Sequence, residues 1–133
     1  MYITWILASV CLTCSANETP NAEQGNVSLP ALKAFDVKGE LHLLGNDETS
    51  KAFAIVFLNP ECPISNAYLP ALNSLATETE SAGVRFLGVV SDVTMTREKI
   101  VKHAEEYKIS FPVLVDAVGE FAAQLQPSHV PEA

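Results

Sequence analysis

The chain has few basic residues. Its 133 residues include eight Lys and Arg against sixteen Asp and Glu, so the formal net charge is −8, and the basic residues form no cluster. Attraction to nucleic acid or to an anionic membrane surface is therefore not expected. The content of 48% hydrophobic and 18% charged residues also excludes a disordered or fibrous chain. One small globular domain that meets proteins or small molecules is the remaining interpretation.

Cysteine is also scarce, with three residues in the whole chain. Cys11 and Cys14 match the C-x-x-C spacing of redox and metal sites. No strand-like run precedes them, no second ligand pair exists elsewhere, and no His follows as haem attachment requires. We therefore predict no redox or metal role for this pair, and no bound metal or other cofactor. Cys62 is then the cysteine that needs an explanation.

Residues 1–16 contain no charged side chain and are largely apolar, which favours a secretory signal. Cys14 and Ala16 would occupy the −3 and −1 positions of a cleavage site, although the usual Lys or Arg near the start is missing. The run is shorter than the ~20 residues that span a bilayer. We expect an exported protein, periplasmic or extracellular, that meets a membrane only through this segment if it is not cleaved. Residues 17–28 are predicted to be a linker, and residues 29–133 the domain.

The rest of the chain has an α/β pattern. Three short, β-branched apolar runs typical of buried strands cover residues 53–58, 84–90 and 111–115. Between them, apolar residues recur every three or four positions over 64–81 and 96–107, which predicts two helices. Strand and helix in alternation imply right-handed parallel crossovers in a sheet that helices cover. Two further strands are expected around a turn at 36–39.

Cys62 lies between the first of these strands and the first helix. Pro63 suits the first helical position because its missing N–H would have no partner there, which makes Cys62 the predicted N-cap. Unpaired N–H groups and the positive end of the helix dipole stabilise a thiolate, which is the nucleophilic form of cysteine. The position therefore predicts a reactive thiol. The alternative is a buried, inert core cysteine.

These motifs together resemble the thioredoxin-like redoxin family, over residues 29–133. The matching segments are 56–58 before Cys62, 62–66, 68–72, 88–92, His103, Tyr107 and 111–116. The family includes alkyl hydroperoxide reductase and thiol-specific antioxidant proteins and exported thiol-disulfide oxidoreductases. The resemblance implies a thioredoxin-like α/β fold, a central mixed sheet flanked by helices. It also implies thiol-disulfide exchange or peroxide reduction by a single nucleophilic cysteine, with a thiol or disulfide protein, a small thiol or a peroxide as partner.

The resemblance also implies further site residues. Val130-Pro131 looks like the family's cis-proline, which lies beside the active cysteine and offers a backbone edge to a bound thiol substrate. Asp92 is placed near the rim of the cysteine, or else caps the helix that begins near Thr96. Ser65 either donates a hydrogen bond to the thiolate or bonds the local backbone.

The chain departs from the family in three respects. Ser65 stands where a C-x-x-C pair has its resolving cysteine, so a mixed disulfide at Cys62 would need an external thiol to open it. Asn59 and Ile55 stand where peroxidatic sites have threonine and proline. The chain stops where the family continues into its last strands, so we expect a truncated C-terminus and an exposed strand edge.

Other interpretations stay open. A noncatalytic thioredoxin-like binding module, or an inactive fragment, is the main alternative. A copper-delivery protein is a weaker one, because such sites use two thiolates and an imidazole. We expect His103 on a solvated helix face. His129 lies either near the thiol or in an unconstrained loop.

Overall fold

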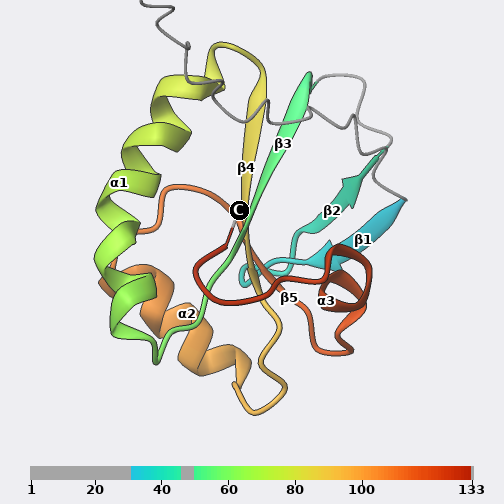
Figure 1. Ribbon diagram of the computed structural model, residues 1–133, viewed down its shortest axis with the longest axis vertical. Coiled ribbons are helices and arrows are strands. Elements are labelled where there is room, and N and C mark those ends of the chain that lie inside the picture. Colours follow the sequence, from blue (N-terminus) through green and yellow to red (C-terminus); the bar gives the residue numbers. More distant parts are fainter. Residues whose placement is uncertain (1–30, 46–49, 133) are drawn as a thin grey trace, which may run out of the picture.

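The computed structural model describes residues 31–45 and 50–132 (Figure 1). Its elements in chain order are β1 (Leu32–Phe35), β2 (Leu41–Leu44), β3 (Ala52–Phe57), α1 (Pro63–Glu80), β4 (Val84–Val90), α2 (Arg97–Glu106), β5 (Val113–Val115) and α3 (Glu120–Leu125). The predicted signal and the predicted linker lie outside the described residues. Among the helices of the described part, none is long and apolar enough to cross a membrane.

The central sheet is parallel, with strand order β3-β4-β5. Ala52 pairs with Val84 at one end of the β3–β4 ladder, and Phe57 pairs with Val89 at the other. An antiparallel bridge adjoins each edge of this sheet, Asp36 to Leu114 beside β5 and Phe57 to Glu132 beside β3. The three strands are parallel to one another, and the two antiparallel bridges at the edges make the sheet mixed, as predicted.

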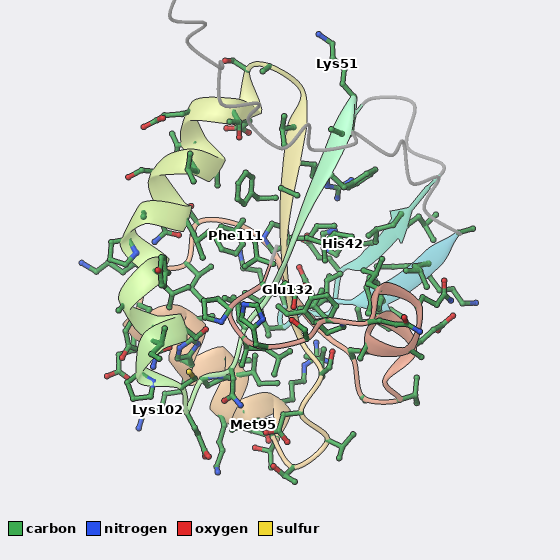
Figure 2. All side chains as sticks on the ribbon, in the orientation of Figure 1. His42, Lys51, Met95, Lys102, Phe111 and Glu132 are labelled. Atoms are coloured by element: carbon green, nitrogen blue, oxygen red, sulfur yellow. The ribbon has the colours of Figure 1, made fainter. Side chains whose placement is uncertain are left out.

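Both faces of the sheet are covered, which explains why its strands are apolar apart from Arg85 near the start of β4. Helices α1 and α2 lie on one side of β3 and β4, and the β1–β2 hairpin and α3 lie on the other (Figure 1). Along β4 the buried side chains alternate, because Leu87 and Val89 face the hairpin whereas Val90 faces α1 and α2. Figure 2 shows the same division, with Phe111 on the α1 side and His42 on the hairpin side.

Asp36 anchors the hairpin to the rest of the domain. Its Oδ1 accepts the backbone N–H groups of Lys38 and Glu40, at 2.8 and 2.9 Å, and its Oδ2 lies 3.0 Å from His42 Nε2. The other ring nitrogen of His42 lies 2.8 Å from Nη2 of Arg85, in β4. Burial alone would raise the pKa of Asp36, but the hydrogen bonds from His42 and from the two amides outweigh it and lower the pKa.

Candidate active site

Cys62 lies where the sequence places it, at the start of α1 after the carboxyl end of β3. The residue is the N-cap in extended conformation, and Pro63 opens the helix. The Cys62 N–H donates to Asn59 O at 3.0 Å and closes a turn, and the Asn66 N–H donates to Cys62 O at 3.0 Å and begins the helical ladder. The predicted N-cap and the predicted first helical residue are both confirmed.

The surroundings of Cys62 combine partial exposure with the end of a helix dipole. The side chain is half-buried and makes no capping hydrogen bond. Its helix is 18 residues long, and the first-turn N–H groups of such a helix have no intrahelical partner. The thiol therefore lies at the electropositive end of a long helix.

The turn before the helix is held by side chains on either side of it. Asn59 Oδ1 accepts the Glu61 N–H at 2.8 Å, and the fully buried Ser65 Oγ accepts the Asn59 N–H at 3.3 Å. Of the two roles expected for Ser65, the local backbone bond is the one observed, and none of the hydrogen bonds found among residues 31–45 and 50–132 joins Ser65 to Cys62 Sγ. Asn59 and Ser65 thus shape the turn that carries the cysteine.

The prediction of a solvated His103 is wrong. This side chain is only 7% exposed, and its Nε2 lies 2.8 Å from Asn66 Oδ1 in α1. Its ring also packs against Tyr107, with the ring centroids 4.7 Å apart. Burial lowers the pKa of His103, although the Glu106 carboxylate opposes this shift. The available signal was the three-residue step from buried Ile100, which puts both residues on one face of α2.

The Val130–Pro131 peptide bond is cis, as the resemblance implies. The Phe57 N–H donates to Glu132 O at 2.8 Å, so this segment runs beside the end of β3 from which the cysteine loop departs. Val130 is 36% exposed. His129 bonds within its own turn, where its Nδ1 lies 2.6 Å from Ser128 Oγ.

Asp92 follows the carboxyl end of β4. Its carboxylate accepts the Thr94 Oγ–H at 2.6 Å and the Thr94 N–H at 2.9 Å, and these bonds lower the pKa of Asp92. The helix-capping alternative is wrong, because Thr96 caps α2 by accepting the Lys99 N–H. The Lys99 ammonium also favours the charged form of Asp92 and lies 3.4 Å from Glu61 Oε1.

One group of side chains elsewhere offers possible metal ligands. Ligand atoms of Asp36, Glu40 and His42 lie within 4.8 Å of one another. Arg85 only donates hydrogen bonds, so His42 Nδ1 accepts its N–H, and Nε2 carries the hydrogen that bonds Asp36. His42 then has no free lone pair for a cation, and the group is explained as the hairpin anchor.

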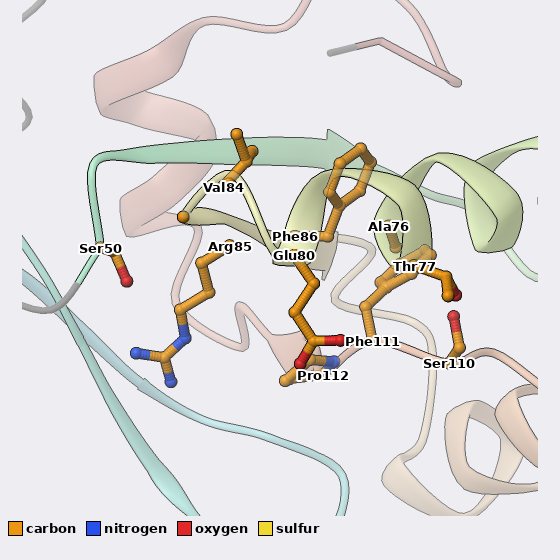
Figure 3. Close-up of a pocket in the computed structure, with 11 residues that line it drawn as sticks. Ser50, Ala76, Thr77, Glu80, Val84, Arg85, Phe86, Ser110, Phe111 and Pro112 are labelled. Carbon is orange, nitrogen blue, oxygen red and sulfur yellow. The ribbon is translucent and has the colours of Figure 1, made fainter.

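A pocket of about 410 Å³ lies at the opposite end of the strands (Figure 3). Arg85 and Glu80 supply charge to its lining, and Phe86 and Phe111 supply aromatic rings. It adjoins the start of β4 and the last turns of α1, whereas ligands of open α/β sheets bind at the carboxyl ends of the strands. Cys62, which follows the carboxyl end of β3, lies at the end of the sheet where such ligands bind.

Three features define a thioredoxin-like protein. They are the parallel βαβ core, the cysteine at the start of α1, and the cis-proline segment beside β3. The chain belongs to the AhpC/TSA family, whose model matches residues 19–130. A search of curated protein sequences finds no match.

Solved structures are similar to this chain in fold. A secreted Mycobacterium tuberculosis disulfide oxidoreductase, described as homologous to E. coli DsbE, has a TM-score of 0.66 and 23% identity over 76% of this chain and 72% of its own. StoA from Bacillus subtilis has a TM-score of 0.64 and 21% identity over 78% of each chain. An uncharacterized conserved protein from Geobacillus kaustophilus has a TM-score of 0.68 and 28% identity over 77% of this chain and 57% of its own.

Proposed function

We propose that the protein is a thiol-disulfide oxidoreductase in which Cys62 is the only protein nucleophile. The observation that carries this proposal is the place of Cys62 as N-cap of α1 in a chain of the AhpC/TSA family. Free N–H groups and the helix dipole favour a thiolate at that position. Partial exposure of the side chain gives a second sulfur a way to reach it.

The reaction is two successive thiol-disulfide exchanges. The Cys62 thiolate attacks one sulfur of a substrate disulfide, forms a mixed disulfide with it, and releases the other sulfur as a thiolate. An external thiolate then attacks the mixed disulfide, takes the substrate sulfur and returns Cys62 to its reduced form. The external thiol is required because Ser65 occupies the position of a resolving cysteine.

Neighbouring residues would align the substrate. Val130 would present its backbone to an extended substrate segment, and Pro131 would hold that backbone in place. Pro63 fixes the start of α1. Asp92 gives a negative charge at the rim, which would favour a substrate with a basic group near its disulfide.

Export from the cytoplasm completes the proposal. It is supported by the apolar residues 1–16, followed by the linker 17–28, and by the fold likeness to a secreted disulfide oxidoreductase. The domain proper would then be residues 29–133. Disulfide substrates persist in such oxidising compartments.

A turnover assay tests the chemistry. The full chain is mixed with a peptide disulfide and excess reduced glutathione, and release of the peptide thiol is followed with wild type and Cys62→Ser. The control is Ser110→Ala, a substitution of an exposed serine between α2 and β5. We expect acceleration by wild type and the control and none by Cys62→Ser. Equal activity of Cys62→Ser and wild type would overturn the proposal. Replacing the disulfide by an alkyl peroxide tests peroxide reduction, in which Cys62 would form a sulfenic acid.

A noncatalytic binding module is the second candidate, favoured by the absence of a resolving cysteine at Ser65. In that case Cys62→Ala would leave capture of a disulfide peptide unchanged. Loss of capture in this variant would favour the oxidoreductase.

A further inference from the structure

A chain of hydrogen bonds links α2 to the turn that carries Cys62. His103 Nε2 lies 2.8 Å from Asn66 Oδ1, and Asn66 Nδ2 donates to Pro60 O at 3.0 Å. The backbone N–H of the same Asn66 donates to Cys62 O at 3.0 Å. One residue of α1 thus binds two carbonyl groups of the cysteine turn, and a buried imidazole fixes its side chain.

Donors and acceptors in this chain can be assigned from chemistry. Pro60 O only accepts, so the amide nitrogen of Asn66 must face it, and Asn66 Oδ1 faces His103. His103 Nε2 therefore carries a hydrogen and donates it. Burial of the ring and its packing on Tyr107 hold the imidazole in this orientation.

We propose that His103 is a positioning residue for Cys62: through Asn66 it holds the turn of residues 59–62 and so keeps Cys62 at the N-terminus of α1. This inference rests on the proposed function, because it assigns the residue that keeps the nucleophile in place. His103 itself makes no contact with the reacting sulfurs in this mechanism.

A second asparagine on α1 supplies a control. Asn73 lies two turns after Asn66 and also ties α1 to the region after α2, since its Nδ2 donates to Lys108 O and its Oδ1 accepts the Ser110 N–H. These hydrogen bonds do not reach the cysteine turn. Loss of Asn73 therefore removes a contact of similar kind and leaves the path from His103 to Cys62 intact.

Two measurements on the full chain test the proposal. The first is the rate of Cys62 alkylation by iodoacetamide at pH 7 in the folded state, divided by the rate in urea, with Cys11 and Cys14 replaced by Ser in every sample. The second is hydrogen exchange of the Cys62 amide, which donates to Asn59 O in the turn. The variants are His103→Leu, His103→Gln, Asn66→Ala, the double variant of His103→Leu with Asn66→Ala, and Asn73→Ala.

We expect His103→Leu and Asn66→Ala each to lower the alkylation ratio about threefold to tenfold and to speed exchange of the Cys62 amide by a similar factor, the worth of one hydrogen bond. The double variant should be no worse than either single one, because both act through one path. His103→Gln, whose amide can donate at the same place, should restore both values to within about twofold. Asn73→Ala should leave both unchanged.

Unchanged exchange of the Cys62 amide in His103→Leu would overturn the proposal, and so would equal effects of Asn73→Ala and Asn66→Ala. If His103→Leu does not fold, a larger effect of Asn66→Ala than of Asn73→Ala supports the proposal. If the wild-type thiol reacts no faster folded than unfolded, the proposed function fails, and amide exchange alone then supports or overturns the positioning role.

Discussion

Replacing Asp36 with Asn tests the anchor of the hairpin. His42 accepts from Arg85 at Nδ1, so its Nε2–H donates to Asp36 Oδ2. The Asn amide can still accept the N–H groups of Lys38 and Glu40 through its oxygen, but its own N–H group then faces His42 Nε2–H. Loss of this charge-assisted bond, with two buried donors left face to face, should cost about 1–3 kcal/mol of unfolding free energy at pH 7.

The cost of this substitution should depend on pH. Burial opposes the shift, but the hydrogen bonds of Asp36 lower its pKa in the folded state below the ordinary value of 3.8. The carboxylate therefore adds stability above about pH 3.8, and this stability is lost as the pH falls through the folded-state pKa. Urea unfolding of wild type and Asp36→Asn should show a smaller difference at pH 3 than at pH 7. Equal stability at pH 7, or a difference that grows at pH 3, would refute the reasoning.

Two further predictions concern the core around the cysteine loop, and urea unfolding checks both. Gly88→Ala should cost about 1–3 kcal/mol by overpacking, because the added Cβ would lie 3.0 Å from Leu58 Cδ1 and 3.2 Å from Phe111 Cε2; wild-type stability would contradict this. Leu69→Ala, at a fully buried position of α1, should cost about 2–5 kcal/mol, whereas Leu75→Ala on the same helix, 46% exposed, should cost less than half a kcal/mol or so. Equal costs would contradict the assignment of the buried face.

Local rules account for the parts of the site that could be predicted from the sequence. A proline without an N–H fits the first helical position, so the start of α1 at Pro63 and the N-cap at Cys62 follow from two adjacent residues. The apolar runs predicted β3 and β4 because strands covered on both faces need no polar alternation. The cis bond before Pro131 came from the family resemblance, since sequence alone favours trans.

Contacts between distant segments could not be predicted. The His103–Asn66 bond joins residues 37 positions apart, and the Arg85–His42 bond joins residues 43 apart. Periodicity gives the face of a helix that a residue occupies, but not the partner that packs against that face. The sequence does not show that Asn66 in α1 is the partner of His103. A polar residue without a known partner is assigned to the solvent-exposed face, and the prediction for His103 was wrong for this reason.

The most direct test of the account is the alkylation rate of Cys62 at pH 7, measured in the folded full chain and again in urea. Residues 1–16 also contain two cysteines, so Cys11 and Cys14 are replaced by Ser in both samples. The account predicts that the folded thiol reacts several-fold faster than the unfolded one, because the start of α1 favours the thiolate. A folded thiol that reacts at the same rate or more slowly would contradict the claim that Cys62 is a nucleophile.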